Sequence, residues 1–259
     1  MANVLLGATG SVAAVRVPAL HDALTADGHA VKVVATTAAT YFFDPADVGP
    51  GRTRSTSDGV GEPQAPARGS TRGNPVARAP GSPGSGRNPD VVILDEDEWP
   101  GRGAGERYAR GDRVLHIELR KWADVYLVAP LDANTLAKLA VGLCDNCLTC
   151  VWRAWDVAKP VVLAPAMNTL MWQHPFTRRH LRSLAADAGA GHIPAHLDEA
   201  QLVAQINDRS KTLRVVAPVS KPLACGDTGV GGLADVADIV AAVRDVLARA
   251  AAPKPAAAS

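Results

Sequence analysis

Short apolar runs alternate with longer amphipathic stretches along most of the chain. The apolar runs predict strands at residues 3–8, 30–36, 91–94, 122–129, 160–164 and 212–218. The amphipathic stretches predict helices over residues 11–26, 131–141, 145–156, 176–188 and 235–251. Short continuous apolar strands that alternate with helices are typical of a parallel sheet whose two faces are both covered.

Two segments interrupt this alternation. In residues 49–90, 16 of the 42 residues are Gly or Pro, and Val60 and Val76 are the only large aliphatic side chains. Such a segment buries too little apolar surface to offset its ordering entropy, so we predict a disordered insert. Residues 195–211 are polar and fit the alternation poorly, which makes them a candidate second insert. We therefore predict a single α/β domain over residues 1–251, a doubly wound parallel sheet in a flavodoxin-like or Rossmann-like three-layer sandwich. Residues 252–259 are expected to be a frayed tail.

Composition narrows the class of protein. The 259 residues include 27 Lys and Arg against 26 Asp and Glu, a net charge of +1, so we expect no nucleic-acid partner. No apolar run reaches membrane-spanning length and no secretory leader is visible, so we expect no membrane partner. Four cysteines without a leader indicate a reducing compartment, and a cytoplasmic protein is the resulting expectation.

The turn after the first strand, Gly7-Ala-Thr-Gly10-Ser11, is suited to binding an anion. A dinucleotide fingerprint needs G-x-G-x-x-G and an acid at the end of the second strand, which here ends in Thr36 and Thr37. None of the 3 tyrosines is followed four residues later by Lys, which excludes a short-chain dehydrogenase. The hydroxyls of Ser11 and Thr36 suit a single terminal phosphate, so a mononucleotide such as FMN is favoured.

Polar loops at 129–135, 164–172 and 223–233 are expected to lie where ligands bind in open α/β sheets. The spacing of Cys144, Cys147 and Cys150 is that of iron–sulfur ligands, but the run falls in a predicted helix, where it forms a small apolar stripe. The acidic run 95–98 is interpreted as a solvated turn. No metal site is therefore predicted.

Three long motifs carry a family resemblance: VLHIELRKWADVYLVAPLDANTLAKLAVGLCDN at 114–146, RAWDVAKPVVLAPAMNTLMWQHPFT at 153–177 and SKPLACGDTG at 220–229. Together they resemble the homo-oligomeric FMN-containing cysteine decarboxylases, in particular the monofunctional phosphopantothenoylcysteine decarboxylases of coenzyme A biosynthesis. The resemblance covers residues 3–43 and 91–245. It implies FMN bound by Gly10, Ser11, Val12, Thr36, Asp132, Ala133, Asn134, Thr135 and Ala166. The position of Asp132 is commonly Ser in the family, so an acid there is a departure.

The resemblance also implies a reaction. The family oxidises the thiol carbon of the substrate to a thioaldehyde, whose C=S bond accepts the electrons when carbon dioxide leaves, and FMN then returns the hydride. By motif position, His116 is the base, Cys225 is the proton donor of the second half-reaction and Asn168 holds the carboxylate. Met171, Lys221 and Ala224 are expected to contact the substrate. A homotrimer with active sites between subunits is the implied assembly.

Two other functions stay open. One is decarboxylation of a C-terminal peptidyl cysteine on the same fold. The other is a non-enzymatic flavoprotein regulator, similar to phosphatase-inhibitory subunits that lack part of the catalytic set. The presence of His116, Asn168 and Cys225 in one chain favours the enzyme.

Overall fold

The computed structural model describes residues 1–50, 86–99, 101–222 and 228–251. Most of the segment 49–90 and all of the tail 252–259 lie outside these residues. The predictions of a disordered insert and of a frayed tail therefore stay predictions.

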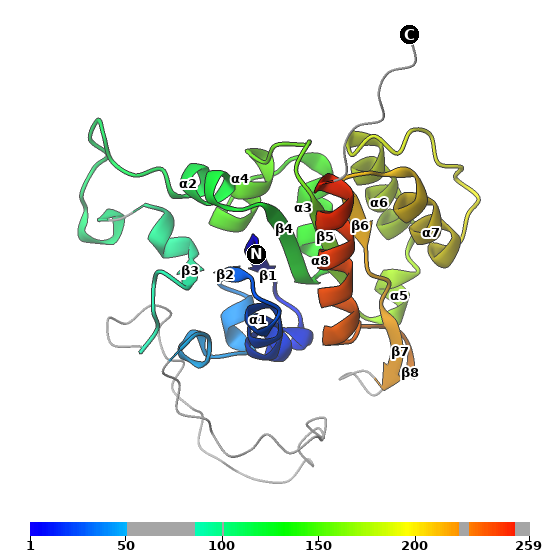
Figure 1. The fold of residues 1–259 in the computed structure, drawn as a ribbon, viewed down its shortest axis with the longest axis horizontal. Helices are drawn as coiled ribbons and strands as arrows, with labels where there is room; N and C mark the ends of the chain where they lie inside the picture. Colours follow the sequence, from blue (N-terminus) through cyan, green and yellow to red (C-terminus); the bar gives the residue numbers. More distant parts are fainter. Residues whose placement is uncertain (51–85, 100, 223–227, 252–259) are drawn as a thin grey trace.

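A six-stranded parallel sheet forms the centre of the molecule, with strand order β3-β2-β1-β4-β5-β6 (Figure 1). Its strands are β1 (Asn3–Ala8), β2 (Ala30–Ala35), β3 (Val92–Leu94), β4 (Val125–Leu131), β5 (Val161–Pro165) and β6 (Leu213–Val215). All six predicted strands are present. The order runs outward from β1 in both directions, which is the doubly wound topology predicted from the sequence.

Helices cover both faces of the sheet. Successive side chains along a strand point alternately into two hydrophobic cores, one on each face. Val4 and Leu6 of β1 pack with α1 and α8 on one face, whereas Leu5 packs on the other face with α2, α3, α4, α6 and α7. The helices are α1 (Val17–Ala26), α2 (Leu115–Trp122), α3 (Ala133–Val141), α4 (Cys147–Arg153), α5 (Thr169–Trp172), α6 (Pro175–Asp187), α7 (Glu199–Arg209) and α8 (Val236–Ala251). Both faces are apolar because a parallel strand is buried on both sides.

Short 3-10 turns join several of these elements: η1 (Val12–Arg16), η2 (Ala39–Tyr41), η3 (Pro45–Asp47), η4 (Asp95–Glu98) and η5 (Arg102–Ala104). The predicted continuous helix over 11–26 is wrong in its first part, because η1 precedes α1 there. Pro18 lies in the first turn of α1 and has no N–H to donate to the preceding turn.

The polar segment 195–211 contains a regular helix, α7, so the expectation that it fits the alternation poorly is wrong. Leu202, Val203 and Ile206 of α7 are buried, and the helix packs against α6 and β6. Asn207 of α7 donates to the carbonyl of Val215 in β6 and accepts from its N–H, each at 2.8 Å. The segment therefore supplies a crossover helix that leads into β6.

The sequence predicts a polar loop over the glycine-rich segment 223–233. The structure describes its later part as a strand, β8 (Thr228–Gly232), paired antiparallel with β7 (Val219–Pro222). Residues 223–227 lie outside the described part. None of the described helices is long and apolar enough to cross a bilayer.

Candidate functional site

The loops that follow β1, β2 and β4 meet at the carboxyl edge of the sheet. Gly10, after β1, lies between Ala38 and Asp132, because a Cβ built on Gly10 would lie 2.7 Å from the Ala38 Cβ and 3.3 Å from the Asp132 Oδ2. β1 and β4 are neighbours in the sheet, but the chain continues from β1 to β2 on one side and from β4 to β5 on the other. Such a reversal of strand order opens a crevice at the carboxyl ends of the two strands. The close approach requires glycine at this position.

Thr9 joins two of these loops. Its buried hydroxyl donates to the carbonyl of Pro130 at 2.8 Å and accepts from the backbone N–H of Asp132 at 2.7 Å. The role of Thr9 is not visible in the sequence, because a threonine beside Gly10 shows no sign of a partner more than 120 residues away. The side chain fixes the spacing between the first turn and the loop that begins α3.

The same edge presents groups that suit a phosphate monoester. Ser11 caps η1, and its Oγ accepts from the N–H of Ala13. Thr36 is buried at the end of β2, and its hydroxyl accepts from Ala39. Among the hydrogen bonds of the described residues, none uses the backbone N–H of Gly10 or of Val12. Backbone N–H groups at the start of a helical turn bind anions, so these residues fit the expected mononucleotide.

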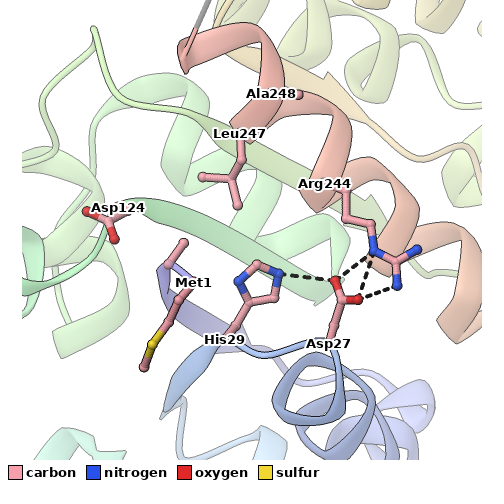
Figure 2. Close-up of a pocket in the computed structure, with 8 residues that line it drawn as sticks. Met1, Asp27, His29, Asp124, Arg244, Leu247 and Ala248 are labelled. Carbon is pink, nitrogen blue, oxygen red and sulfur yellow. Dashed lines mark hydrogen bonds and ion pairs between the residues drawn. The ribbon is translucent and has the colours of Figure 1, made fainter.

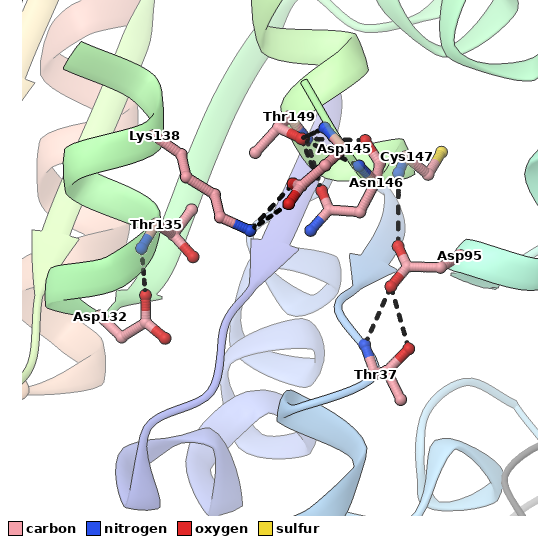
Figure 3. Close-up of polar contacts among 9 residues, drawn as sticks. All are labelled: Thr37, Asp95, Asp132, Thr135, Lys138, Asp145, Asn146, Cys147 and Thr149. Carbon is pink, nitrogen blue, oxygen red and sulfur yellow. Dashed lines mark hydrogen bonds and ion pairs between the residues drawn. The ribbon is translucent and has the colours of Figure 1, made fainter. Parts of the chain in front are cut away.

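Asp132 has a structural role as well as its position beside Gly10. Its Oδ1 accepts from the N–H of Thr135 at 2.6 Å and caps α3 (Figure 3). The other residues expected near the cofactor follow from this loop: Thr135 is buried, Ala133 is half-buried and Asn134 is exposed. Ala166, after β5, is buried and donates its N–H to the carbonyl of Leu131. The structure thus brings the expected cofactor residues together along one edge.

Asp95 connects the ends of β2 and β3 to the start of α4 (Figure 3). Its Oδ2 accepts from the N–H and the hydroxyl of Thr37 at 3.1 and 3.0 Å, and its Oδ1 accepts from the N–H of Cys147 at 3.3 Å. The carboxylate therefore holds η4 in place at the β3 side of the sheet.

His116 lies near the start of α2 and faces the acidic turn η4. Its Nδ1 is 2.8 Å from Oε1 of Glu98, and only 5% of the Glu98 side chain is exposed. Trp99 meets the imidazole edge-on, with ring centroids 6.3 Å apart. The interpretation of residues 95–98 as a solvated turn is therefore wrong for Glu98, which is buried, while Glu96 is exposed. Asp95, Asp97 and Glu98 have hydrogen-bond partners in other segments of the chain, which compensate for the loss of water.

The cysteines differ from the predicted helical stripe. α4 begins at Cys147, so Cys144 precedes the helix and is exposed, while Cys147 is buried and Cys150 half-buried. Glu98, His116 and Cys150 bring their ligand atoms within 4.8 Å of one another. Burial and, next, the nearby Glu98 carboxylate raise the pKa of the Cys150 thiol to about 12, so the thiol keeps its proton at neutral pH. The 2.8 Å contact between His116 and Glu98 is a hydrogen bond.

Asn168 follows β5 and caps α5, with its Oδ1 accepting from the N–H of Leu170 at 2.9 Å. The β7–β8 hairpin lies directly on this loop, since the carbonyl of Gly231 accepts from the N–H of Met167 at 2.9 Å. A Cβ on Gly231 would come within 2.2 Å of the Met167 carbonyl oxygen, so the contact requires glycine. Met171, in α5, is half exposed at 48%.

The remaining expected substrate residues lie in the sequence between Lys221 and Cys225, close to the β7–β8 pair. Lys221 is in β7, and its side chain is outside the described part of the chain. Ala224 and Cys225 also lie outside it. The strands that flank residues 223–227 are held against the Asn168 loop.

One protomer does not bring His116 and Asn168 together. Glu98, the partner of His116, follows β3, whereas Asn168 follows β5, and the order β3-β2-β1-β4-β5 separates these strands by four neighbouring pairs. At about 4.8 Å for each pair, the two strands are about 19 Å apart. Figure 1 accordingly shows α2 and α5 on opposite sides of the molecule.

A surface hollow of about 600 Å³ opens at the other edge of the sheet (Figure 2). It is lined by Asp27, His29, Asp124, Arg244 and neighbouring residues, and none of the expected site residues contributes. The Arg244 guanidinium, paired with Asp27, lowers the pKa of that carboxyl. Asp27 of this hollow is already paired with Arg244 and His29.

Both the sequence and the fold of this chain are similar to those of known proteins. The sequence matches the family described as Flavoprotein over residues 1–248. It is 39% identical to mouse (Mus musculus) phosphopantothenoylcysteine decarboxylase over 249 residues, which are 95% of this chain and 88% of the relative. It is 37% identical to the rice (Oryza sativa subsp. japonica) phosphopantothenoylcysteine decarboxylase over 242 residues, which are 93% of this chain and 79% of the relative.

Two solved structures are similar over nearly their whole length. One is a cysteine-to-serine mutant of PPC decarboxylase complexed with pantothenoylaminoethenethiol, with a TM-score of 0.65, 35% identity and coverage of 96% of this chain and 99% of that chain. The other is the FMN binding protein AtHal3, with a TM-score of 0.59, 37% identity and coverage of 94% and 95%. The chain therefore belongs to the flavoprotein family, among the phosphopantothenoylcysteine decarboxylases.

Proposed function

We propose that this protein is an FMN-dependent decarboxylase that converts 4′-phosphopantothenoylcysteine to 4′-phosphopantetheine in coenzyme A biosynthesis. The observation that carries the proposal is the similarity to phosphopantothenoylcysteine decarboxylase over 95% of this chain, at 39% identity. The carboxyl edge of the sheet supports it, because Gly10, Ser11 and Thr36, with groups suited to a phosphate, follow β1 and β2 at the edge where Gly10 approaches the loops after β2 and β4.

FMN is the cofactor, and when bound it supplies reversible two-electron oxidation of the carbon attached to the substrate sulfur. The N–H groups of Gly10 and Val12 and the hydroxyls of Ser11 and Thr36 are proposed to hold its phosphate. The loop 132–135 and Ala166 are proposed to line the rest of the cofactor. Asp132 spends one carboxylate oxygen on capping α3, which limits the negative charge that it presents to the phosphate.

The chain's own residues then position the substrate and move protons. Asn168 is proposed to hold the carboxylate through its amide N–H groups, a neutral contact that releases carbon dioxide more readily than an arginine would. Its Oδ1 is anchored to Leu170, which fixes the orientation of the side chain. His116 is proposed as the proton acceptor. Cys225, which lies between β7 and β8 in the sequence, is proposed as the proton donor.

The spacing of these residues favours an oligomer. Glu98, the hydrogen-bond partner of His116, and Asn168 follow strands about 19 Å apart, so a single site that uses both His116 and Asn168 takes them from two protomers. We propose a homotrimer, in which each heterologous interface repeats around a three-fold axis and closes the ring. A cytoplasmic location is also proposed, since Cys144, Cys147 and Cys150 are all free thiols.

Mass spectrometry of 4′-phosphopantothenoylcysteine incubated with the FMN-loaded protein tests the activity. The expected product has lost one carbon dioxide, and a Cys225→Ser variant should not form it at the wild-type rate. An unchanged substrate together with capture of a phosphatase would instead identify a regulatory flavoprotein. Decarboxylation of a peptide ending in cysteine, with no turnover of the phosphopantothenoyl substrate, would identify the peptidyl-cysteine enzyme.

A mixing experiment tests the shared site. His116→Asn and Asn168→Asp variants are each expected to be inactive. If every site takes the two residues from neighbouring protomers, oligomers reassembled from equal amounts regain about a quarter of the sites. Recovery of no activity would contradict the shared site, and a wild-type protein that is monomeric by light scattering would contradict the trimer.

A further inference from the structure

Glu98 is a buried acid for which the proposed function has assigned no role. Its side chain is 5% exposed, and among the described residues its one ion-pair partner is His116, at 2.8 Å. No lysine or arginine of the described chain pairs with it. A buried carboxylate is costly unless hydrogen-bond donors compensate it, so its contact with the expected base requires an explanation.

The turn that carries Glu98 is held in place at two of its three other acids. Asp95 accepts from the Thr37 and Cys147 segments, and Asp97 pairs with Arg87 and accepts from the N–H of Leu94 at 2.7 Å. These contacts tie η4 to three other segments of the chain. Glu98 therefore presents its carboxylate to His116 from a preorganised position.

A thiol lies beside the same carboxylate. The Sγ of Cys150 lies within 4.8 Å of ligand atoms of Glu98 and His116. Burial and, next, the nearby carboxylate raise the pKa of the Cys150 thiol to about 12, so the thiol keeps its proton at neutral pH. As a carboxylate, Glu98 can only accept, which makes the Nδ1 of His116 the donor of the 2.8 Å contact.

The consequence for His116 is a defined tautomer. If Glu98 accepts, Nδ1 carries the proton and Nε2 carries the lone pair. The His116 side chain is 18% exposed while its Nδ1 faces the buried acid, so the edge of the ring that bears Nε2 is the accessible one. We propose that Glu98 is a positioning residue that holds His116 as the Nδ1–H tautomer and so presents Nε2 as the proton acceptor. This inference rests on the proposed function, because it assumes that His116 acts as the base.

Glu98→Gln tests the inference with little change in volume. A glutamine amide can turn its NH₂ toward Nδ1, which stabilises the opposite tautomer. In the serine-protease triad the corresponding replacement costs about 10⁴ in kcat by this mechanism, so a loss of about 10² to 10⁴ is expected here, with KM changed less than about threefold. Glu98→Asp keeps the charge and should retain more than a tenth of kcat. Glu118→Gln is the matched control. Glu118 lies on α2, the helix that carries His116, but within the described part of the chain it forms an exposed ion pair with Arg113 and not with the imidazole.

Nitrogen-15 NMR of the protein labelled at histidine reports the tautomer without any turnover, and the His116→Asn spectrum assigns the signals. The wild type should show a protonated Nδ1, and Glu98→Gln should move the proton to Nε2. A protonated Nε2 in the wild type, or an unchanged spectrum in Glu98→Gln, would overturn the inference. A switched tautomer with unchanged kcat would overturn its catalytic consequence. A switched tautomer in a protein with no decarboxylase activity would confirm the role of Glu98 in setting the tautomer and refute the proposed function. If Glu98→Gln does not fold, Glu98→Asp decides, since it must retain the Nδ1–H form.

Discussion

Gly10 offers the sharpest test of the cofactor cradle. Gly10→Ala adds one methyl group at a point where it would lie 2.7 Å from the Ala38 Cβ. Gly10 is not among the glycines with positive φ, so the backbone conformation itself accepts alanine. The effect of the substitution is therefore steric and confined to the meeting point of the loops after β1, β2 and β4.

The size of the effect follows from the overlap. Two carbon atoms in ordinary contact are about 3.5–4.0 Å apart, so the new methyl is about 1 Å too close. Forcing extra atoms into a packed site costs about 1–3 kcal/mol. If the strain falls on the conformation that binds FMN, the Kd rises by about 5- to 150-fold. If it falls on the folded state as a whole, the Tm drops by about 2–12 °C.

Titration of the apoprotein with FMN, followed by quenching of flavin fluorescence, measures the Kd directly. Gly86→Ala is the matched control, because a Cβ on Gly86 meets nothing within 4 Å. Ala38→Gly in the Gly10→Ala background removes the clashing methyl and should restore at least half of the lost binding free energy. An unchanged Kd and an unchanged Tm in Gly10→Ala would refute the close approach of these loops.

Three further predictions concern buried polar groups. Thr9→Val leaves the N–H of Asp132 without its acceptor and should lower the free energy of unfolding in urea by about 1–3 kcal/mol, whereas Thr9→Ser should not. Tyr126→Phe should cost about 1–2 kcal/mol at pH 7, because the buried hydroxyl donates to a backbone carbonyl. Burial raises the pKa of Tyr126 well above its usual value, so only the unfolded chain ionises at this residue as the pH rises past 10. The difference in unfolding free energy between wild type and Tyr126→Phe should therefore shrink above pH 10. A difference that stays constant would contradict this. Iodoacetamide at pH 8, read by peptide mass spectrometry, should label exposed Cys144 and spare Cys147, whose pKa burial raises; equal labelling would contradict the burial.

The layered fold was predictable because its signal is local. Runs such as Val4-Leu5-Leu6 are apolar at every position, which only a strand buried on both faces requires, and the structure places all six predicted strands in one parallel sheet. The prediction failed at α7 because the local signal there is weak. Only three of its side chains are buried, among many polar ones. The 3-10 start of the first helix also needed more than periodicity, because Pro18 decides it.

The sequence by itself therefore determined the strands, the glycine turn and the motifs that indicate the family, all of which are properties of neighbouring residues. Only the tertiary structure decided that Thr9 bridges two loops, that Glu98 is buried against His116 and that Asn168 is remote from both. A run of four acids reads as solvated when its partners, Thr37, Arg87 and His116, lie elsewhere in the chain. The physical reason is that burial of a charge depends on donors brought close by the strand order, which is set by the packing of the whole sheet and not by any one segment.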